Sequence, residues 1–162
     1  MTLGDSGQIP LDRRVVDQLN VSRETIEQLA AYLALLAKWQ PRINLVSSAT
    51  LADAWRRHIL DSAQLAGYLP ENGAHILDIG SGAGFPGLVL SIITDNQVTL
   101  VESDQRKSVF LQTVIPRIGF DGHCQERADR GDSSTGCRHS DSAGARFSRE
   151  TAAAAGQTTA LC

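Results

Sequence analysis

The stretch His75-Ile-Leu-Asp-Ile-Gly-Ser-Gly-Ala-Gly-Phe-Pro-Gly87 decides the fold of this 162-residue chain. Its first five residues form a short apolar run, typical of a buried strand, that leads directly into glycines at 80, 82, 84 and 87. The apolar segment that starts at Leu88 predicts a helix. A strand, a glycine turn and a helix start favour a nucleotide-like ligand, because glycines admit the ligand to the backbone and a helix N-terminus offers free N–H groups.

The residues that follow continue the pattern of alternating helices and strands. Helices are predicted over Gly87–Ile93 and Gln105–Ile115, and a second strand over Val98–Val101, with Glu102 at its carboxyl end. Strand, helix, strand and helix in this order predict a parallel sheet of the doubly wound, Rossmann-like α/β class.

The preceding part of the chain reads as helical. Residues 1–10 are expected to be disordered, and residues 11–70 to form a helical segment with helices over 11–19, 23–40 and 51–69. The apolar stripe of the second helix favours packing against the domain that begins near residue 71. The helical segment also carries Arg56 and Arg57, which could lie on a solvated face or contact a phosphate backbone, as could Arg106 and Lys107 in a later helix.

Composition excludes several classes of function. The net charge of −3 and the pI near 5.7 give no global basic signature for nucleic acid, so only a local basic surface remains. Neither a signal peptide nor an apolar run long enough for a membrane span is recognisable, and a cytoplasmic protein is expected. Metal binding is not expected, because the cysteines do not form the close-spaced pairs of a zinc site; they are Cys124, Cys137 and Cys162.

Two alignments of the glycines imply different cofactors. Gly82-x-Gly84-x-x-Gly87 matches a dinucleotide fingerprint, although Pro86 interrupts it. Asp78-x-Gly80-x-Gly82-x-Gly84 instead suits a cofactor with an amino-acid end, because a carboxylate can bind its ammonium group. Asp78 could equally bond backbone N–H groups of the turn. Glu102, 22 residues after Gly80, suits the ribose hydroxyls, with an ordinary solvated acid as the alternative.

These residues resemble a known family. The segment Asp78–Gly87, with Lys38-Trp-Gln-Pro-Arg-Ile-Asn-Leu and Arg57-His-Ile-Leu-Asp-Ser62, is similar to the small-subunit ribosomal RNA guanine-7 methyltransferases, also called the glucose-inhibited division protein B family. The resemblance covers about Leu11 to Phe120. It implies a class I methyltransferase sheet, S-adenosylmethionine as cofactor, and small-subunit ribosomal RNA or the ribosomal subunit as partner. The cofactor-binding residues expected from the glycine pattern are Asp78, Gly80, Gly82, Gly84 and Glu102, and the resemblance implies contacts from Gly80, Phe85 and Glu102.

The implied reaction does not require a catalytic residue of its own. Guanine N7 carries a lone pair and no proton, so its attack on the sulfonium methyl group needs alignment rather than a general base. Two other functions remain open. One is a nicotinamide-dependent oxidoreductase, which Asp78 and Pro86 disfavour, and the other is a non-catalytic RNA-binding module that uses the four basic residues Arg56, Arg57, Arg106 and Lys107.

The resemblance ends where the composition changes. From Gly122 to Cys162 the large apolar residues are limited to Phe147 and Leu161, so this tail is predicted to be poorly structured. Codons permitted for Gly122 onward, read one nucleotide later, can spell Val-Thr-Val-Lys-Ser-Ala-Arg-Ile-Glu, which resembles the family's next strand. The hypothesis is a frameshift near Asp121. A sheet left with two strands would then expose an edge, and weak or no binding of S-adenosylmethionine is expected.

Overall fold

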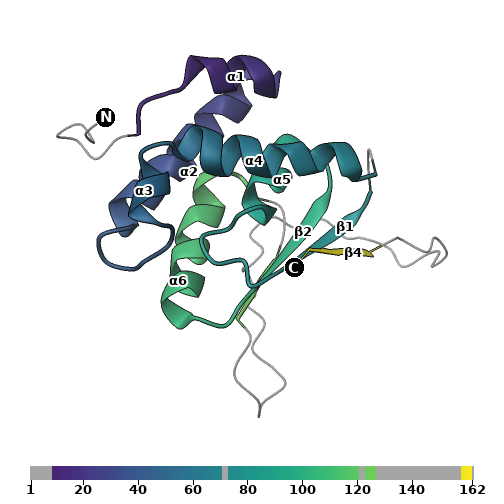
Figure 1. Ribbon diagram of the computed structural model, residues 1–162. Coiled ribbons are helices and arrows are strands. Elements are labelled where there is room, and N and C mark those ends of the chain that lie inside the picture. Colours follow the sequence, from purple (N-terminus) through teal and green to yellow (C-terminus); the bar gives the residue numbers. More distant parts are fainter. Residues whose placement is uncertain (1–8, 71–72, 121–122, 127–157, 162) are drawn as a thin grey trace, which may run out of the picture.

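The computed structural model describes residues 9–70, 73–120, 123–126 and 158–161 (Figure 1). Helices occupy the first half of the chain, and strands alternate with helices from residue 75 onward. The elements, in order, are α1 (Arg13–Leu19), α2 (Arg23–Trp39), α3 (Ser48–Leu51), the π-helix η1 (Trp55–Leu60), α4 (Asp61–Ala63), the 3₁₀-helix η2 (Gln64–Tyr68), β1 (His75–Ile79), α5 (Gly87–Ile93), β2 (Gln97–Glu102), α6 (Gln105–Val114), the 3₁₀-helix η3 (Ile115–Arg117), β3 (His123–Glu126) and β4 (Thr158–Leu161).

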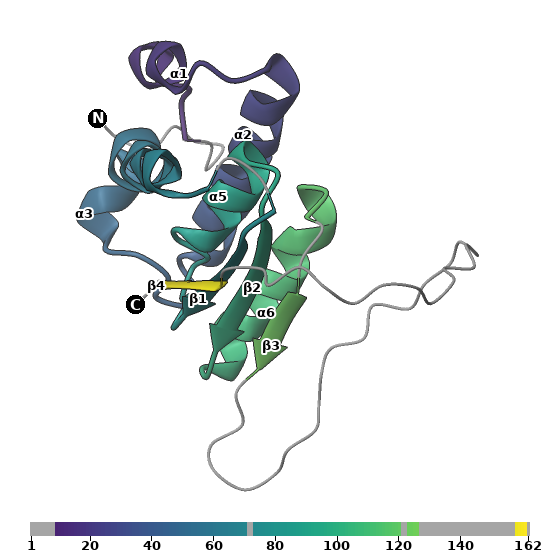
Figure 2. The ribbon, with the colours of Figure 1, turned by 90° about the vertical axis from the view of Figure 1, so that its right-hand side faces the viewer.

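The sheet is parallel and has the strand order β3-β2-β1-β4. Figure 2 shows β1, β2 and β3 running in the same direction, with α5 and α6 as the connections between them. The register places Ile79 beside Val101 and Glu102 beside Glu126, so the carboxyl ends of β1, β2 and β3 meet at one edge. A ligand of an open parallel sheet binds outside this edge.

The number of strands differs from the sequence-based expectation. Two strands were expected, with both neighbours absent; in the structure β3 pairs with β2 and β4 pairs with β1, so neither predicted strand is an edge strand. The backbone of 123–126 and 158–161 is therefore ordered into a sheet within the tail that was predicted to be poorly structured. The rest of that prediction falls on residues 122, 127–157 and 162, which lie outside the described residues, and the structure does not test the hypothesis of a frameshift near Asp121.

One hydrophobic core joins the helical segment to the sheet. The apolar stripe of α2 is buried in it, as predicted, through Leu29, Leu33 and Leu36, each at most 1% exposed. These side chains belong to the same cluster as Ile76 of β1 and Leu100 of β2. The helix starts are also those that local chemistry favours, since Ser22 caps α2 and Asp104 caps α6 with side-chain oxygens.

The predicted helix over 51–69 is broken into four pieces. After α3, capped by Ser47, the chain forms η1, α4 and η2. Trp55 and Ile59 of η1 are buried while Arg56 and Arg57 stay exposed. Such π segments are frequent at functional sites. None of the described helices is long and apolar enough to cross a membrane.

Candidate cofactor site at the glycine turn

The glycine turn, residues 80–87, begins with two glycines that face open space. Gly80 and Gly82 have φ angles of 76° and 57°, in the left-handed region that favours glycine. A Cβ atom at Gly80 would meet no atom within 4 Å, and one at Gly82 would meet only the carbonyl oxygen of Gly80, at 3.7 Å. The structure therefore leaves the backbone of these two glycines accessible to a ligand.

The other two glycines are required by packing. A Cβ at Gly84, which has a φ of 98°, would collide with the side chain of Leu88 and lie 3.0 Å from the Tyr32 hydroxyl. A Cβ at Gly87 would lie 2.5 Å from both Asp78 Oδ2 and Leu100 Cδ2. Gly84, predicted as a cofactor-binding residue, thus also has a structural reason to be glycine.

Asp78 lies under the turn and holds the start of α5. Its carboxyl is 3% exposed, and Oδ2 accepts a hydrogen bond from the Gly87 amide at 3.0 Å. Of the two roles considered for Asp78, this geometry shows the bond to a backbone N–H. Burial raises the pKa of Asp78 to about 6, and the nearby Glu102 carboxylate adds to the rise, while the Gly87 hydrogen bond opposes it.

Two backbone N–H groups at the start of α5 already have hydrogen-bond acceptors within the chain. The Gly87 amide donates to Asp78, and the Leu88 amide donates to the carbonyl of Gly84 at 2.8 Å. The expectation of free N–H groups at the helix N-terminus is wrong for these two positions, because a carboxylate and a turn carbonyl occupy them. A diphosphate bound there would also meet the carboxyl of Asp78.

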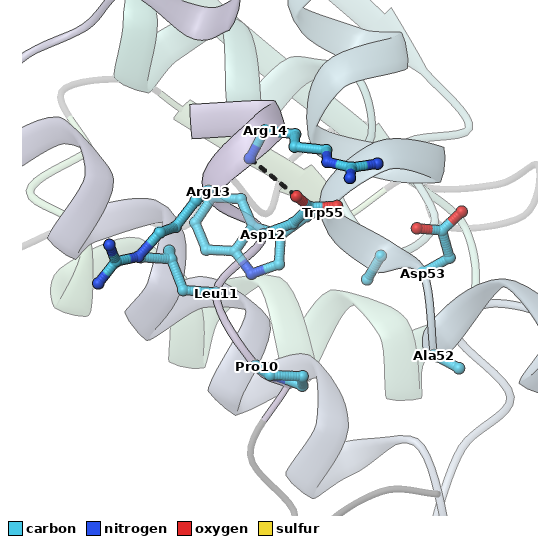
Figure 3. A pocket seen from close by; sticks show the side chains of 9 residues that line it. Pro10, Leu11, Asp12, Arg13, Arg14, Ala52, Asp53 and Trp55 are labelled. Carbon is cyan, nitrogen blue, oxygen red and sulfur yellow. Dashed lines mark hydrogen bonds between the residues drawn. The ribbon is translucent and has the colours of Figure 1, made fainter. Parts of the chain in front are cut away.

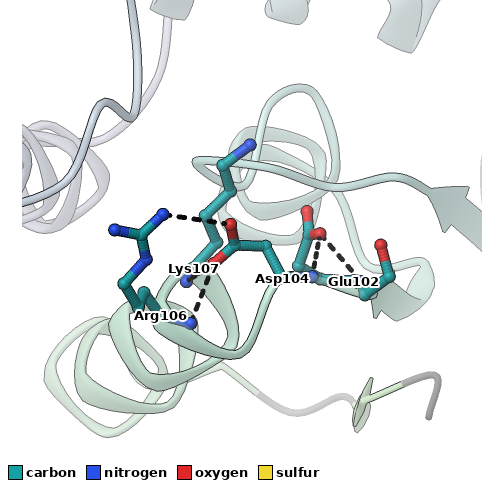
Figure 4. A network of polar contacts seen from close by, with 5 residues as sticks. Glu102, Asp104, Arg106 and Lys107 are labelled. Atoms are coloured by element: carbon teal, nitrogen blue, oxygen red, sulfur yellow. Dashed lines mark hydrogen bonds and ion pairs between the residues drawn. The ribbon is translucent and has the colours of Figure 1, made fainter. Parts of the chain in front are cut away.

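Glu102 links the end of β2 to the glycine turn. Oε2 accepts from the Gly82 amide at 2.7 Å, and Oε1 accepts from the amides of Ser103 and Asp104, both at 2.7 Å (Figure 4). The side chain is 5% exposed, so the reading of Glu102 as an ordinary solvated acid is wrong. Each carboxylate oxygen can accept more than one hydrogen bond, which leaves acceptor capacity for a hydroxyl group at this edge.

Ser81 ties the two predicted strands together at the same edge. Its hydroxyl donates to the carbonyl of Asp78 at 2.9 Å and accepts from the Val101 amide at 3.0 Å. The amides of Gly80 and Ser81 in turn donate to the Val101 carbonyl, at 2.8 and 3.1 Å. Sequence analysis did not identify Ser81, because its role depends on a strand 20 residues away.

Phe85 contacts two aromatic rings from distant parts of the chain. Its ring centroid lies 4.8 Å from that of His58, with the planes 19° apart, and 5.1 Å from that of Tyr32. The Tyr32 hydroxyl donates to the carbonyl of Ala83 at 2.5 Å. Sequence analysis assigned neither partner to the site: Tyr32 lies in the apolar helix over 23–40, and His58 was used only within the motif Arg57-His-Ile-Leu-Asp-Ser62 that carries the family resemblance.

The predicted RNA-binding residues fall into two separate pairs. Arg56 and Arg57 lie on η1, where Arg57 is 3.8 Å from Asp61; Arg106 and Lys107 lie in the first turn of α6, where Arg106 is 3.6 Å from Asp104 (Figure 4). Both ion pairs are exposed and therefore weak, so all four cations remain available to a phosphate. Within the described ranges no hydrogen bond or ion pair connects the two pairs.

A pocket of about 430 Å³ lies away from the turn, between the start of α1 and the segment that joins α3 to η1 (Figure 3). Its lining includes Asp12, Arg13, Arg14, Asp53 and Trp55. The indole N–H of Trp55 is buried without a hydrogen-bond partner.

No group of three or more potential metal ligands occurs among the residues that the structure describes. Of the three cysteines, the structure describes Cys124, which is buried, whereas Cys137 and Cys162 lie outside the described ranges.

This architecture defines the class of protein: a mixed helix-and-strand domain with parallel strands and a glycine turn between two buried carboxylates. Residues 25–145 match the family GidB, which is described as rRNA small subunit methyltransferase G. The chain belongs to that family. The match reaches beyond Phe120, where the sequence analysis ended the resemblance.

Curated relatives named Ribosomal RNA small subunit methyltransferase G agree with this assignment. The protein of Rhodospirillum rubrum is 65% identical over 91 residues, which cover 56% of this chain and 45% of the relative. That of Rhodospirillum centenum is 60% identical over 99 residues (61% and 46%), and that of Parvibaculum lavamentivorans is 56% identical over 104 residues (62% and 46%). The matched part of the chain thus spans about half the length of these relatives.

Proposed function

We propose that this chain binds S-adenosylmethionine at the glycine turn and belongs to an enzyme that methylates guanine N7 of small-subunit ribosomal RNA in the cytoplasm. The observation that carries the proposal is the position of two buried carboxylates on either side of the open glycines. The carboxyl of Asp78 accepts a hydrogen bond from the Gly87 amide at the start of α5, and the carboxylate of Glu102 accepts one from the Gly82 amide. Family membership supports the reaction and the RNA substrate.

The order of the strands supports a Rossmann-like methyltransferase sheet. All four strands are parallel, and α5 and α6 connect neighbours, as in doubly wound folds. In that arrangement the cofactor crosses the carboxyl ends of β1 and β2. Gly80 and Gly82 would then admit it to the backbone, Glu102 would accept hydrogen bonds from its ribose, and Phe85 would contact it with the part of its ring that the two neighbouring rings leave uncovered.

The carboxyl of Asp78 argues for this cofactor over a dinucleotide. A pyrophosphate binds at the amides of the helix that follows the glycine turn. Here Asp78 already accepts from the Gly87 amide, so a diphosphate would have to displace a buried carboxylate and face its charge. A cofactor with an ammonium group meets no such repulsion. The nicotinamide-dependent oxidoreductase is therefore the less favoured function.

Calorimetric titration of the chain tests the choice of cofactor. S-adenosylmethionine or its demethylated product should bind measurably, although more weakly than micromolar, and NADH at millimolar concentration should not bind. The sequence alone leads to the expectation of weak or no binding of S-adenosylmethionine. Glu102→Gln should abolish the heat of binding, whereas the exposed Glu27→Gln, which alters a surface pair with Arg23, should retain it. Binding of NADH instead would refute the proposed cofactor.

A transfer assay tests the substrate. Small ribosomal subunits that lack the modification are incubated with the chain and S-adenosylmethionine carrying a labelled methyl group. Nucleoside mass spectrometry should find the label in 7-methylguanosine. Label in another nucleoside would contradict the proposed reaction, and binding of the subunit without transfer would favour a non-catalytic RNA-binding module that uses Arg56, Arg57, Arg106 and Lys107.

A further inference from the structure

The π-helix η1 presents consecutive residues to different surroundings. Arg56 and Arg57 are exposed, whereas His58 is half-buried and its ring stacks on that of Phe85. The Nε2 atom of His58 lies 3.0 Å from the Thr50 hydroxyl, at the end of α3. His58 is therefore fixed by a polar contact on one side and a ring contact on the other.

Phe85 belongs to the part of the glycine turn that carboxylates do not hold. Glu102 binds the Gly82 amide and Asp78 binds the Gly87 amide, and Phe85 lies between these two points. Its ring contacts are with His58 of η1 and Tyr32 of α2. The rings of His58 and Tyr32 thus contact the segment of the turn that lies between the two carboxylate hydrogen bonds.

That segment has an intrinsic tendency to adopt other conformations. Glycine loses more conformational freedom on ordering than any other residue, and Gly82 and Gly84 lie three residues and one residue before Phe85. Tyr32 fixes the carbonyl of Ala83, and Gly84 leaves no room for a side chain beside Leu88. A contact that fixes the Phe85 ring therefore limits the motion of the whole turn.

We infer that His58 is a positioning residue, which holds Phe85 and through it the glycine turn in the conformation that receives the cofactor. The role in cofactor binding rests on the proposed function, whereas the ordering of the turn does not. Burial lowers the pKa of His58, and the neighbouring Arg57 lowers it further while Asp61 opposes the shift.

Hydrogen exchange of the full chain without cofactor tests the ordering of the turn. In His58→Ala the amides of Gly82 and Gly84 should exchange about tenfold faster relative to amides of β2 than in the unaltered chain. His58→Phe, which keeps a ring against Phe85, should restore exchange to within about threefold. Trp39→Ala is the matched control, because it removes an edge-on contact with Phe110, 5.9 Å between centroids, outside the turn. Trp39→Ala should not increase the exchange rate of the Gly82 and Gly84 amides relative to that of β2.

Two results would overturn the inference. One is an unchanged exchange rate of the turn amides in His58→Ala. The other is an increase in exchange rate that is equal in the turn and in β2, because such an increase indicates general destabilisation. If His58→Ala does not fold, Thr50→Val decides the question. It removes the hydrogen bond to His58 together with the contacts between the Thr50 hydroxyl and Ser47, and it should accelerate exchange of the turn selectively by a smaller factor. Ser47→Ala, which removes the hydroxyl contact with Thr50 and keeps the bond to His58, should not do so. No selective acceleration in Thr50→Val, or an equal acceleration in Ser47→Ala, would overturn the inference.

Titration with S-adenosylhomocysteine is the second readout. His58→Ala should weaken binding by about tenfold or more, and His58→Phe should recover most of the affinity. Equal affinity of His58→Ala and the unaltered chain would contradict the role in cofactor binding. An unaltered chain that binds no S-adenosylhomocysteine would instead refute the proposed function, and the exchange measurement would still decide whether His58 orders the turn.

Discussion

The Oδ2 atom of Asp78 lies 3.0 Å from the amide nitrogen of Gly87, and the approach is so close that a Cβ on Gly87 would be 2.5 Å from the same oxygen. The carboxyl thus occupies the space that a side chain at residue 87 would fill. This relationship connects the end of β1 to the start of α5, because the position of the Asp78 carboxyl requires that residue 87 has no side chain.

Burial of Asp78 should make the stability of the chain depend on pH. Its pKa is about 6 in the folded chain and 3.8 when exposed, so the folded state binds more protons between these values. This contribution is fully present below pH 3.8 and is lost as the pH rises through 6, a difference of about 3 kcal/mol. Urea unfolding at pH 4, 5, 6 and 7 measures it.

Asp78→Asn isolates that contribution, because the amide cannot titrate and its oxygen can still accept from Gly87. The variant should be more stable than the unaltered chain at pH 7, by up to about 3 kcal/mol, and the advantage should vanish near pH 4. Unfolding free energies that run parallel in the two chains from pH 4 to 7 would show that Asp78 is not the titrating group.

Gly87→Ala should destabilise the chain, because the added methyl group would overlap Asp78 and Leu100. Both neighbours belong to β strands of the core and cannot move freely, so a loss of about 2–3 kcal/mol is expected. The matched control is Gly67→Ala, since a Cβ there meets nothing within 4 Å. Urea unfolding should show at most a few tenths of a kcal/mol for the control; similar losses in both variants would contradict the packing role of Gly87.

Tyr32→Phe should cost about 1–2 kcal/mol, because it removes the hydroxyl that donates to the Ala83 carbonyl and leaves a buried acceptor without this partner. Tyr68→Phe removes the same atom from a side chain that is 86% exposed and should change little. Thermal unfolding of the two variants provides the comparison. Equal stability of both variants and the unaltered chain would mean that the hydroxyl of Tyr32 contributes nothing to the turn.

Glu102→Gln should destabilise the glycine turn even without cofactor. Both carboxylate oxygens accept backbone N–H groups, and the amide would present a donor to at least one of them. A loss of about 1–3 kcal/mol is expected by urea unfolding. The exposed Glu27→Gln should lose less than about 0.5 kcal/mol, because surface ion pairs contribute little. A comparable small loss at Glu102 would show that its hydrogen bonds are not important for folding.

Local sequence signals predicted the elements that depend on neighbouring residues. The strand at 75–79, the helix at 87–93 and the helix that begins at residue 23 all follow from short-range patterns, and the structure confirms them. The candidate site residues near these elements were proposed for the same reason: the glycines, Asp78 and Glu102 lie within or directly after predicted strands.

The features that sequence reasoning missed depend on contacts between distant residues. Helical periodicity over 51–69 gave no sign of η1, because the buried residues Leu51, Trp55 and Ile59 keep the spacing of a regular helix. Ser81 and Tyr32 likewise acquire their roles only when strands 20 residues apart, or a helix and a turn, are brought together. Pairing of β3 and β4 with the two predicted strands could not be expected from so polar a tail.

The core shared by α2, β1 and α6 means that the chain has no independent cofactor-binding half. Leu33 and Leu36 bury their side chains in the same cluster as Ile76 and Phe110, and Gln28 donates to the Ile118 carbonyl at 2.8 Å. A fragment that begins at Gly73 would lose one wall of this cluster and the tyrosine that fixes the glycine turn. We therefore expect the helices and the sheet to unfold in a single cooperative transition, and attempts to reduce the protein to its glycine turn and two strands should yield an unfolded polypeptide.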